Sequence, residues 1–185
     1  MELLEKVQAI LEERQQSYFD ISDCIWEFAE LAYEENRSAS IQADYMARQG
    51  FHIVQNAADI PTAFIAEWGS GHPIIGICGE YDALPGMNQQ ADCNEFRPVV
   101  EGGAGHACGH HLLGTAAMAA VDALKTVMER EAISGTIRYY GCPAEEYGSG
   151  KGFMAKAGVF DDLDIALCWH PYHFNAVELS GALAD

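Results

Sequence analysis

The segment Gly-His-Ala-Cys-Gly-His-His at residues 105–111 gathers a thiol and several imidazoles into one short stretch of the chain. Two adjacent carboxylates, Glu145 and Glu146, and a further imidazole, that of His170, follow downstream. Thiolate, imidazole and carboxylate groups are the side chains that bind divalent transition metals in proteins. Their combination predicts a hydrolytic metal site.

Cys108 and His110 are the strongest candidates for metal ligands. They are two residues apart, so in an extended stretch both side chains leave the same side of the backbone. A helix expected to begin just after them would direct free N–H groups toward the thiol and favour the thiolate. The alternative, a buried cysteine beside histidines that cap the helix, stays open at this point.

Glu145 and Glu146 follow the expected strand 135–142 and a proline. At a strand end the two carboxylates could divide the work. One would bind metal, and the other would take a proton from water and pass it to a leaving amine. The alternative for such a pair is a solvated surface position.

Asp82 and His170 are weaker candidates when each is considered alone. Asp82 could accept a hydrogen bond from the imidazole of His110 and fix its tautomer, or it could simply form the turn before Pro85. His170 follows the apolar segment 165–169, where a lone histidine is more often a core or capping residue. The neighbouring candidates are what make these two residues plausible parts of a metal site.

Hydrophobic periodicity divides the chain into alternating helices and strands. Helices are expected at 2–31, 38–50, 110–132 and 150–157. Strands are expected at 51–54, 62–68, 73–78, 135–142, 165–169 and 175–179, with 73–78 and 165–169 buried, and a long loop is expected at 85–105. This order predicts an α/β fold with a mostly parallel central sheet, helices on both faces, and the site beyond the carboxyl ends of the strands.

The composition fits a single globular domain over residues 1–185. The formal net charge of -18 argues against binding to nucleic acid or to a membrane of anionic lipid. No apolar run reaches the ~18 residues of a membrane span, and the first residues show no signal-peptide pattern. The six cysteines form no Cys-x-x-Cys pair, which predicts free thiols, several of them buried, and a cytoplasmic protein.

Four motifs also occur in the order and spacing of a known family. They are Gly-Glu-Tyr-Asp-Ala-Leu-Pro (79–85), Gly-His-Ala-Cys-Gly-His (105–110), Gly-Cys-Pro-Ala-Glu-Glu-Tyr-Gly-Ser-Gly-Lys (141–151) and Trp-His-Pro (169–171). Over roughly residues 15–178 the sequence resembles the di-metal amidohydrolases, a metallopeptidase family with a zinc-exopeptidase-like catalytic domain. The family includes aminoacylases, indoleacetyl-amino-acid hydrolases and aminobenzoyl-glutamate hydrolase, and the resemblance is strongest to the aminobenzoyl-glutamate hydrolase branch.

The resemblance implies a role for each candidate residue. Cys108 would bridge two divalent ions, Mn or Zn, and His110, His170 and Glu146 would be further ligands. Glu145 would be the general base and acid. Asp82 would orient an imidazole. The implied reaction is hydrolysis of the amide that joins an acyl or aryl group to an amino acid in a small-molecule substrate.

Two departures from the family pattern limit this inference. His111 stands where many relatives carry Asp or Asn. Relatives are also about twice as long, with a lid and dimerisation domain and a last histidine ligand. The chain is therefore expected to be a fragment, a truncated product or half of a split enzyme, which pairs with a complementary C-terminal half or forms a homo-oligomer.

The alternative function is a metal-binding or interaction module without catalysis of its own. A redox role for the Cys108 thiol is disfavoured, because no resolving cysteine is near it in the sequence.

Overall fold

The computed structural model describes residues 2–172. Its helices are α1 (Leu3–Phe28), α2 (Asn36–Arg48), α3 (His110–Glu131), α4 (Glu145–Gly148) and α5 (Gly150–Lys156), with a short 3-10 helix, η1 (Ala57–Asp59). Its strands are β1 (His52–Gln55), β2 (Phe64–Ser70), β3 (Ile74–Glu80), β4 (Gly135–Cys142) and β5 (Ile165–Leu167). The predicted α/β class is confirmed, and the strand expected at 175–179 lies outside the described residues. Between residues 2 and 172, no helix is both long and apolar enough to cross a membrane.

The strands form one five-stranded sheet in the order β1-β2-β4-β3-β5. β3 pairs in parallel with β4 and β5, because α3 carries the chain back before β4 begins and the segment with α4 and α5 carries it back before β5 begins. β2 pairs antiparallel with both β1 and β4. The sheet is therefore mixed rather than mostly parallel. The physical reason is that short connections join β1 to β2 and β2 to β3, and short connections reverse the direction of the chain.

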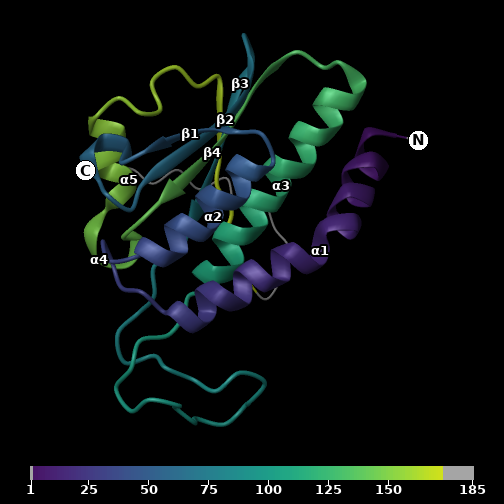
Figure 1. Cartoon of the computed structure of the whole chain (residues 1–185). Helices are drawn as coiled ribbons and strands as arrows, with labels where there is room; N and C mark the ends of the chain where they lie inside the picture. The colour runs from purple at the N-terminus through teal and green to yellow at the C-terminus, as the bar shows by residue number, and fades with distance from the viewer. Residues whose placement is uncertain (1, 173–185) are drawn as a thin grey trace.

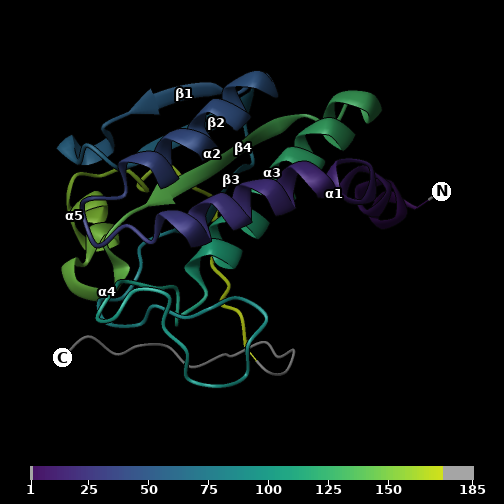
Figure 2. The same cartoon turned by 60° about the horizontal axis from the view of Figure 1, so that its bottom comes forward.

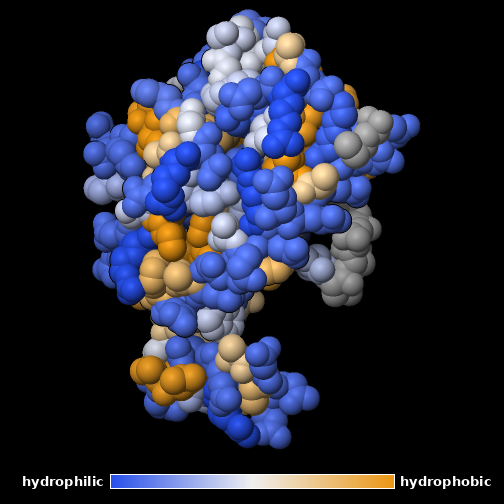
Figure 3. Space-filling view, turned by 45° about the vertical axis from the view of Figure 1, so that its right-hand side comes forward, coloured by the Kyte–Doolittle hydropathy of each residue, from blue (hydrophilic) through white to orange (hydrophobic). Residues whose placement is uncertain are grey.

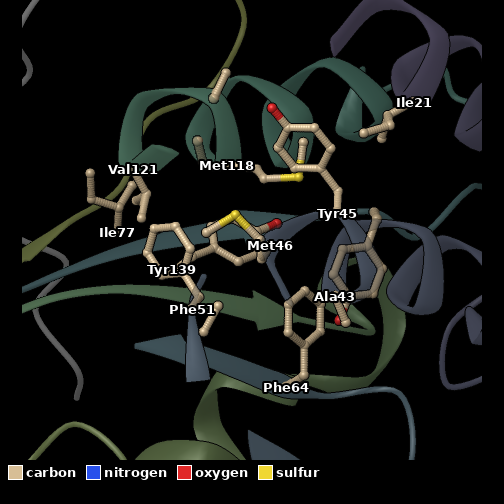
Figure 4. Packing of buried hydrophobic residues seen from close by; sticks show 14 of the residues in the cluster. Ile21, Ala43, Tyr45, Met46, Phe51, Phe64, Ile77, Met118, Val121 and Tyr139 are labelled. Atoms are coloured by element: carbon tan, nitrogen blue, oxygen red, sulfur yellow. The ribbon is translucent and has the colours of Figure 1, made fainter. Parts of the chain in front are cut away.

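Helices cover both faces of the sheet, as predicted (Figures 1 and 2). On one face α3 packs on β3 and β4, and α1 packs on α3. Figure 4 shows this core, where Tyr139 of β4 lies below Met118 and Val121 of α3. On the other face Tyr140 packs in a second core with Met154 of α5. Successive side chains of β4 thus pack on opposite faces of the sheet, so the sheet lies between two layers of helices.

β5 differs from the buried strand predicted at 165–169. Ile165 and Leu167 are 45% and 49% exposed, because β5 lies at the edge of the sheet. The cysteines follow the same division: Cys78 and Cys142 on the inner strands are buried, whereas Cys168, just after β5, is exposed. Apolar composition indicated a strand here but could not show that the strand is at an edge.

Residues 85–105 form a long loop, as predicted, and project from the body of the protein as a lobe (Figures 1 and 3). Asn88 organises this loop. Its side-chain oxygen accepts hydrogen bonds from the backbone N–H groups of Val99 and Val100, both at 2.8 Å, and its amide donates to the carbonyl of Ala104 at 3.1 Å. The loop thereby returns the chain from the end of β3 to the start of α3.

The start of α3 lies close to the end of β3 because Gly114 has no side chain. A Cβ atom at Gly114 would lie 2.3 Å from the backbone carbonyl oxygen of Glu80. This close approach holds His110, one turn earlier on α3, next to the residues that follow β3.

Replacing Gly114 by Ala is expected to lower the free energy of unfolding by about 2 kcal/mol, because the new methyl group must push α3 away from β3. Gly152→Ala on α5 is the matched control, since its Cβ would make only an ordinary contact, 3.6 Å from Cβ of Ser149. That control should be neutral or should stabilise by up to about 1 kcal/mol through helix propensity. Urea unfolding of both variants measures the difference. An equal gain in stability for both would contradict the close approach.

Candidate metal centre and active site

The predicted site residues meet at one edge of the sheet, beyond the carboxyl ends of β3 and β4 (Figure 1). Asp82 follows β3, and Glu145 and Glu146 begin α4 just after β4. Cys108 and His110 lie at the start of α3. Parallel neighbours β3 and β4 end at the same edge, so their connections are brought together there.

The imidazole of His110 is fully buried and is held by Asp82. Its Nδ1–H donates to Oδ1 of Asp82 at 2.9 Å and lies 3.0 Å from the backbone carbonyl oxygen of the same residue. The second carboxylate oxygen of Asp82 accepts a hydrogen bond from the backbone N–H of Glu146 at 2.9 Å. Because Nδ1 is the donor, Nε2 of the neutral ring carries the lone pair and faces the site.

Carboxylate oxygens surround Nε2 of His110. The distances are 3.9 Å to Glu145, 4.0 Å to Glu146 and 3.1 Å to Glu80. Glu80 was not among the residues predicted for the site. It lies two residues before Asp82 in the same motif, and that spacing places two side chains on one side of an extended chain. This signal could have identified Glu80 from the sequence.

Cys108 and His170 contribute a second pair of potential ligands. Sγ of Cys108 lies 3.2 Å from Nε2 of His170. The potential ligand atoms of Cys108, His110 and His170 all lie within 4.8 Å of one another, and so do those of Glu80, His110 and Glu145. The two groups share His110, so they form one site with a buried side and a more exposed side that holds His170.

The carboxylates give this site a negative electrostatic character. Burial opposes ionisation of Asp82, but the hydrogen bonds from His110 and from the backbone of Glu146 outweigh burial and keep the pKa of Asp82 below its ordinary value. Burial also favours a lower pKa for His110, yet its hydrogen bond to Asp82 and the charges of Asp82 and Glu80 raise that pKa. A cation is therefore favoured at Nε2 of His110.

The thiol of Cys108 experiences the same negative charges. Burial, followed by the nearby carboxylates of Glu146 and Glu145, raises the pKa of Cys108 to about 12. The thiolate expected from the helix N-terminus is therefore disfavoured here, because like charge outweighs the helix dipole. A coordinating cation would reverse this balance, since a thiol that binds metal is deprotonated.

His106 and His111 belong to a separate cluster rather than to the candidate site. Their rings lie 5.1 Å apart, and both pack against Trp26 of α1. Nε2–H of His106 donates to the backbone carbonyl of Ile25 at 3.0 Å. Burial lowers the pKa of each histidine to about 4, so both are neutral. His111, which departs from the family pattern, therefore packs α3 against α1.

Glu35 holds the turn that presents the two glutamates. It is fully buried, and its carboxylate accepts a hydrogen bond from the backbone N–H of Ala144 at 2.8 Å. Ala144 has the left-handed backbone angles φ 55° and ψ 46°, which cost energy in a residue with a side chain. Burial raises the pKa of Glu35 above its ordinary value, although hydrogen bonds partly oppose the shift.

Glu35→Gln and Glu35→Ala should separate the effect on stability of the hydrogen bond that Glu35 accepts from the effect of its charge. Glu35→Ala is expected to lower the free energy of unfolding by about 1–3 kcal/mol, because the N–H of Ala144 loses its acceptor. Glu35→Gln keeps an acceptor. The pKa of Glu35 in the folded protein is raised above its ordinary value of 4.5. The contribution of Glu35 to stability is therefore fully present below pH 4.5, and it is lost as the pH rises through the pKa of the folded protein.

The parent protein should therefore lose stability relative to Glu35→Gln as the pH rises above 4.5 and the buried carboxylate ionises. Urea unfolding of both proteins over a series of pH values from 4.5 upward measures this difference. A difference that stays constant with pH would show that the charge of Glu35 plays no part.

The residues at the site fit divalent metal ions. In the described part of the chain, Nε2 of His110, Oε2 of Glu80 and Oε1 of Glu146 are buried atoms without a hydrogen-bond partner. Buried polar atoms in native proteins are nearly always satisfied, so these atoms indicate a place for a cationic ligand. Nitrogen and oxygen donors, with the sulfur of Cys108 beside them, suit Zn and Mn.

Thiol, imidazole and carboxylate side chains gathered at the strand ends of an α/β domain are typical of metallohydrolases. Residues 76–177 match the family described as peptidase family M20/M25/M40. The chain belongs to this family, which confirms the resemblance drawn from the four motifs.

Individual relatives agree with this assignment. The chain is 47% identical over 184 residues to a p-aminobenzoyl-glutamate hydrolase subunit of Escherichia coli strain K12, covering 100% of this chain and 38% of that protein. It is 33% identical over 175 residues to Xaa-Arg dipeptidase of Homo sapiens, covering 86% and 36% of the two chains. A solved Bacillus subtilis structure, described as a dinuclear metal binding peptidase from the M20 family, matches with a TM-score of 0.67 and 25% identity, covering 84% of this chain and 42% of that one. The chain thus spans less than half the length of these relatives.

Proposed function

We propose that the chain is the catalytic part of a metal-dependent amidohydrolase that cleaves the amide between an acyl or aryl group and an amino acid. The observation that carries this proposal is the meeting of sulfur, nitrogen and carboxylate donors around the lone pair of His110. Cys108, His110, Glu146 and His170 are the proposed ligands of two divalent ions, Zn or Mn. When bound, such ions would polarise the amide carbonyl and lower the pKa of water.

Glu145 is the proposed general base and acid. Its side chain is 40% exposed, the highest exposure among the three glutamates around His110, so it can reach both water and substrate. It would take a proton from the attacking water and deliver it to the amide nitrogen as that nitrogen leaves. Glu146 differs because its backbone is tied to Asp82, which fixes its carboxylate deeper in the site.

Asp82 is a positioning residue in this proposal. Its two oxygens hold the Nδ1–H of His110 and the backbone N–H of Glu146. Metal-binding imidazoles are commonly oriented by a carboxylate in this way, which also makes the ring a better ligand.

The Escherichia coli relative suggests the substrate class. Its name specifies p-aminobenzoyl-glutamate, an aryl amide of an amino acid. We propose the same class of small-molecule substrate here, in the cytoplasm. That relative is also named as a subunit, which supports an association with a partner subunit. Because the chain matches only 38% of that protein, we also propose that it associates with a complementary C-terminal half or with further copies of itself.

The first test is elemental analysis of the chain purified without chelators or a metal-affinity tag. We expect about two divalent ions per chain, and release of p-aminobenzoate from p-aminobenzoyl-glutamate only by the metal-loaded protein. Metal retention without hydrolysis, in this chain and in longer forms that contain it, would favour the metal-binding module over the enzyme. Absence of bound metal in all these forms would overturn the proposal.

A further inference from the structure

Glu80 is a buried carboxylate that the proposed mechanism does not use. It ends β3, is 9% exposed, and its Oε2 is a buried atom without a hydrogen-bond partner in residues 2–172. That oxygen lies 3.1 Å from Nε2 of His110, which also lacks such a partner. Nδ1–H of His110 is donated to Asp82, so Nε2 of the neutral ring presents a lone pair. Two acceptor atoms that face each other this closely require either a proton or a metal cation between them.

Lys151 of α5 fixes the orientation of this carboxylate. Its ammonium donates to Oε1 of Glu80 at 2.5 Å and leaves Oε2 directed at His110. Burial favours a lower pKa for Lys151, but the hydrogen bond and the charge of Glu80 raise it, so the ammonium stays charged. The ion pair therefore joins α5 to β3 and holds one oxygen of Glu80 toward the site.

The separation of the two facing atoms matches that of two ligands on one ion. When nitrogen and oxygen ligands lie about 2.0–2.2 Å from an ion, two of them are about 3.3–3.6 Å apart at a tetrahedral angle and about 2.8–3.1 Å apart at the right angle of an octahedral site. The observed 3.1 Å between Oε2 of Glu80 and Nε2 of His110 falls in the octahedral range.

We propose that Glu80 is an additional carboxylate ligand of the divalent ion that His110 binds. This inference rests on the proposed metal-dependent function. It makes the two sides of the site chemically different: the His110 side is rich in oxygen, whereas the side of Cys108 and His170 offers sulfur and nitrogen. Oxygen-rich sets suit Mn, so Mn is the ion expected on the His110 side.

Titration of the chain with Mn²⁺ alone, followed by the electron paramagnetic resonance signal of the free ion, tests this inference without an activity assay. Glu80→Gln keeps the size of the side chain but removes its charge, and it should weaken Mn²⁺ binding by at least about 100-fold, the upper end of the effect of residues that only orient ligands. Glu129→Gln, on the exposed face of α3 and paired with Lys125, is the matched control and should bind Mn²⁺ like the parent. Circular dichroism checks that each variant is folded.

Two further variants, Lys151→Met and the double variant Glu80→Gln/Lys151→Met, show whether Glu80 is a metal ligand or only the ion-pair partner of Lys151. If Glu80 binds the ion, Lys151→Met should keep Mn²⁺ affinity within about tenfold, because the ion replaces the ammonium as the counter-charge. The double variant should then bind as weakly as Glu80→Gln. If Glu80 only neutralises Lys151, the double variant should recover the affinity of the parent, and the inference is overturned.

The outcomes also separate this inference from the proposed function. Mn²⁺ binding that is lost in His110→Ala but unchanged in Glu80→Gln would overturn the role of Glu80 alone. A parent chain that binds neither Mn²⁺ nor Zn²⁺ would overturn both.

Discussion

Glu145→Gln is expected to lower kcat for hydrolysis of p-aminobenzoyl-glutamate by about 10³-fold, within the range that a general base contributes. Glutamine keeps the size of the side chain but cannot accept the proton of the attacking water. Metal content should stay unchanged, because the proposed ligands do not include this carboxylate. Steady-state kinetics on a metal-loaded form that is active, together with elemental analysis, measures both effects.

Glu146→Gln is the matched comparison for this variant, since the two residues are adjacent and similarly distant from Nε2 of His110, at 3.9 Å and 4.0 Å. We expect it to lose bound metal as well as activity. If Glu145→Gln loses bound metal and Glu146→Gln keeps it, the assignment of Glu145 as the base and Glu146 as the ligand is wrong. A kcat for Glu145→Gln within about twofold of the parent would show that no general base is needed at this position.

Asp82→Ala is expected to lower the free energy of unfolding by about 3–5 kcal/mol, the cost of breaking a buried charged pair. Asp82 is 1% exposed, and both of its oxygens are hydrogen-bonded. The variant would leave the Nδ1–H of His110 and the backbone N–H of Glu146 without an acceptor in a buried place. Urea unfolding of the metal-free protein measures this loss.

Asp82→Asn is the control, because it preserves one acceptor oxygen and the shape of the side chain. Its loss of stability should be smaller than that of Asp82→Ala, while metal affinity falls by about 10–100-fold in both. Equal stability of all three proteins would show that the contacts of Asp82 contribute nothing to the fold.

The pH dependence of this effect has a definite sign. The pKa of Asp82 in the folded protein lies below its ordinary value of 3.8, so its stabilising contribution is present above that value. It is lost as pH falls through the lower folded pKa. The gap in unfolding free energy between the parent and Asp82→Ala should therefore be full at pH 7 and should shrink below about pH 3.8.

The sequence by itself determined the elements with strong local signals. β4 at Gly135–Cys142 has the predicted bounds, because a segment rich in β-branched and aromatic residues begins at a glycine and ends before a proline. α3 begins at His110 as expected, since the periodic apolar pattern starts there after Gly109, whose φ of 79° suits a glycine. These signals depend on local backbone preference and burial periodicity, so they can be read from adjacent residues.

The motifs at the strand ends also indicated the site. The sequence motifs contain Asp82, Cys108, His110, Glu145, Glu146 and His170, and the fold places these residues together. Asp82, Glu145, Glu146 and His170 follow predicted strands, and the carboxyl ends of parallel strands share one end of the sheet. Cys108 and His110 stand out because a thiol and imidazoles are so close in the sequence.

The tertiary structure alone decided how these pieces are arranged. The mixed sheet and the exposed edge strand β5 depend on which strands pair, and pairing is set by non-local contacts that the sequence pattern does not specify. Lys151 reaches Glu80 across 71 positions of sequence, and His106 and His111 pack against Trp26 of α1 instead of joining the site. A local pattern fixes the face on which a side chain emerges, but only the packing of whole helices and strands brings it to its partner.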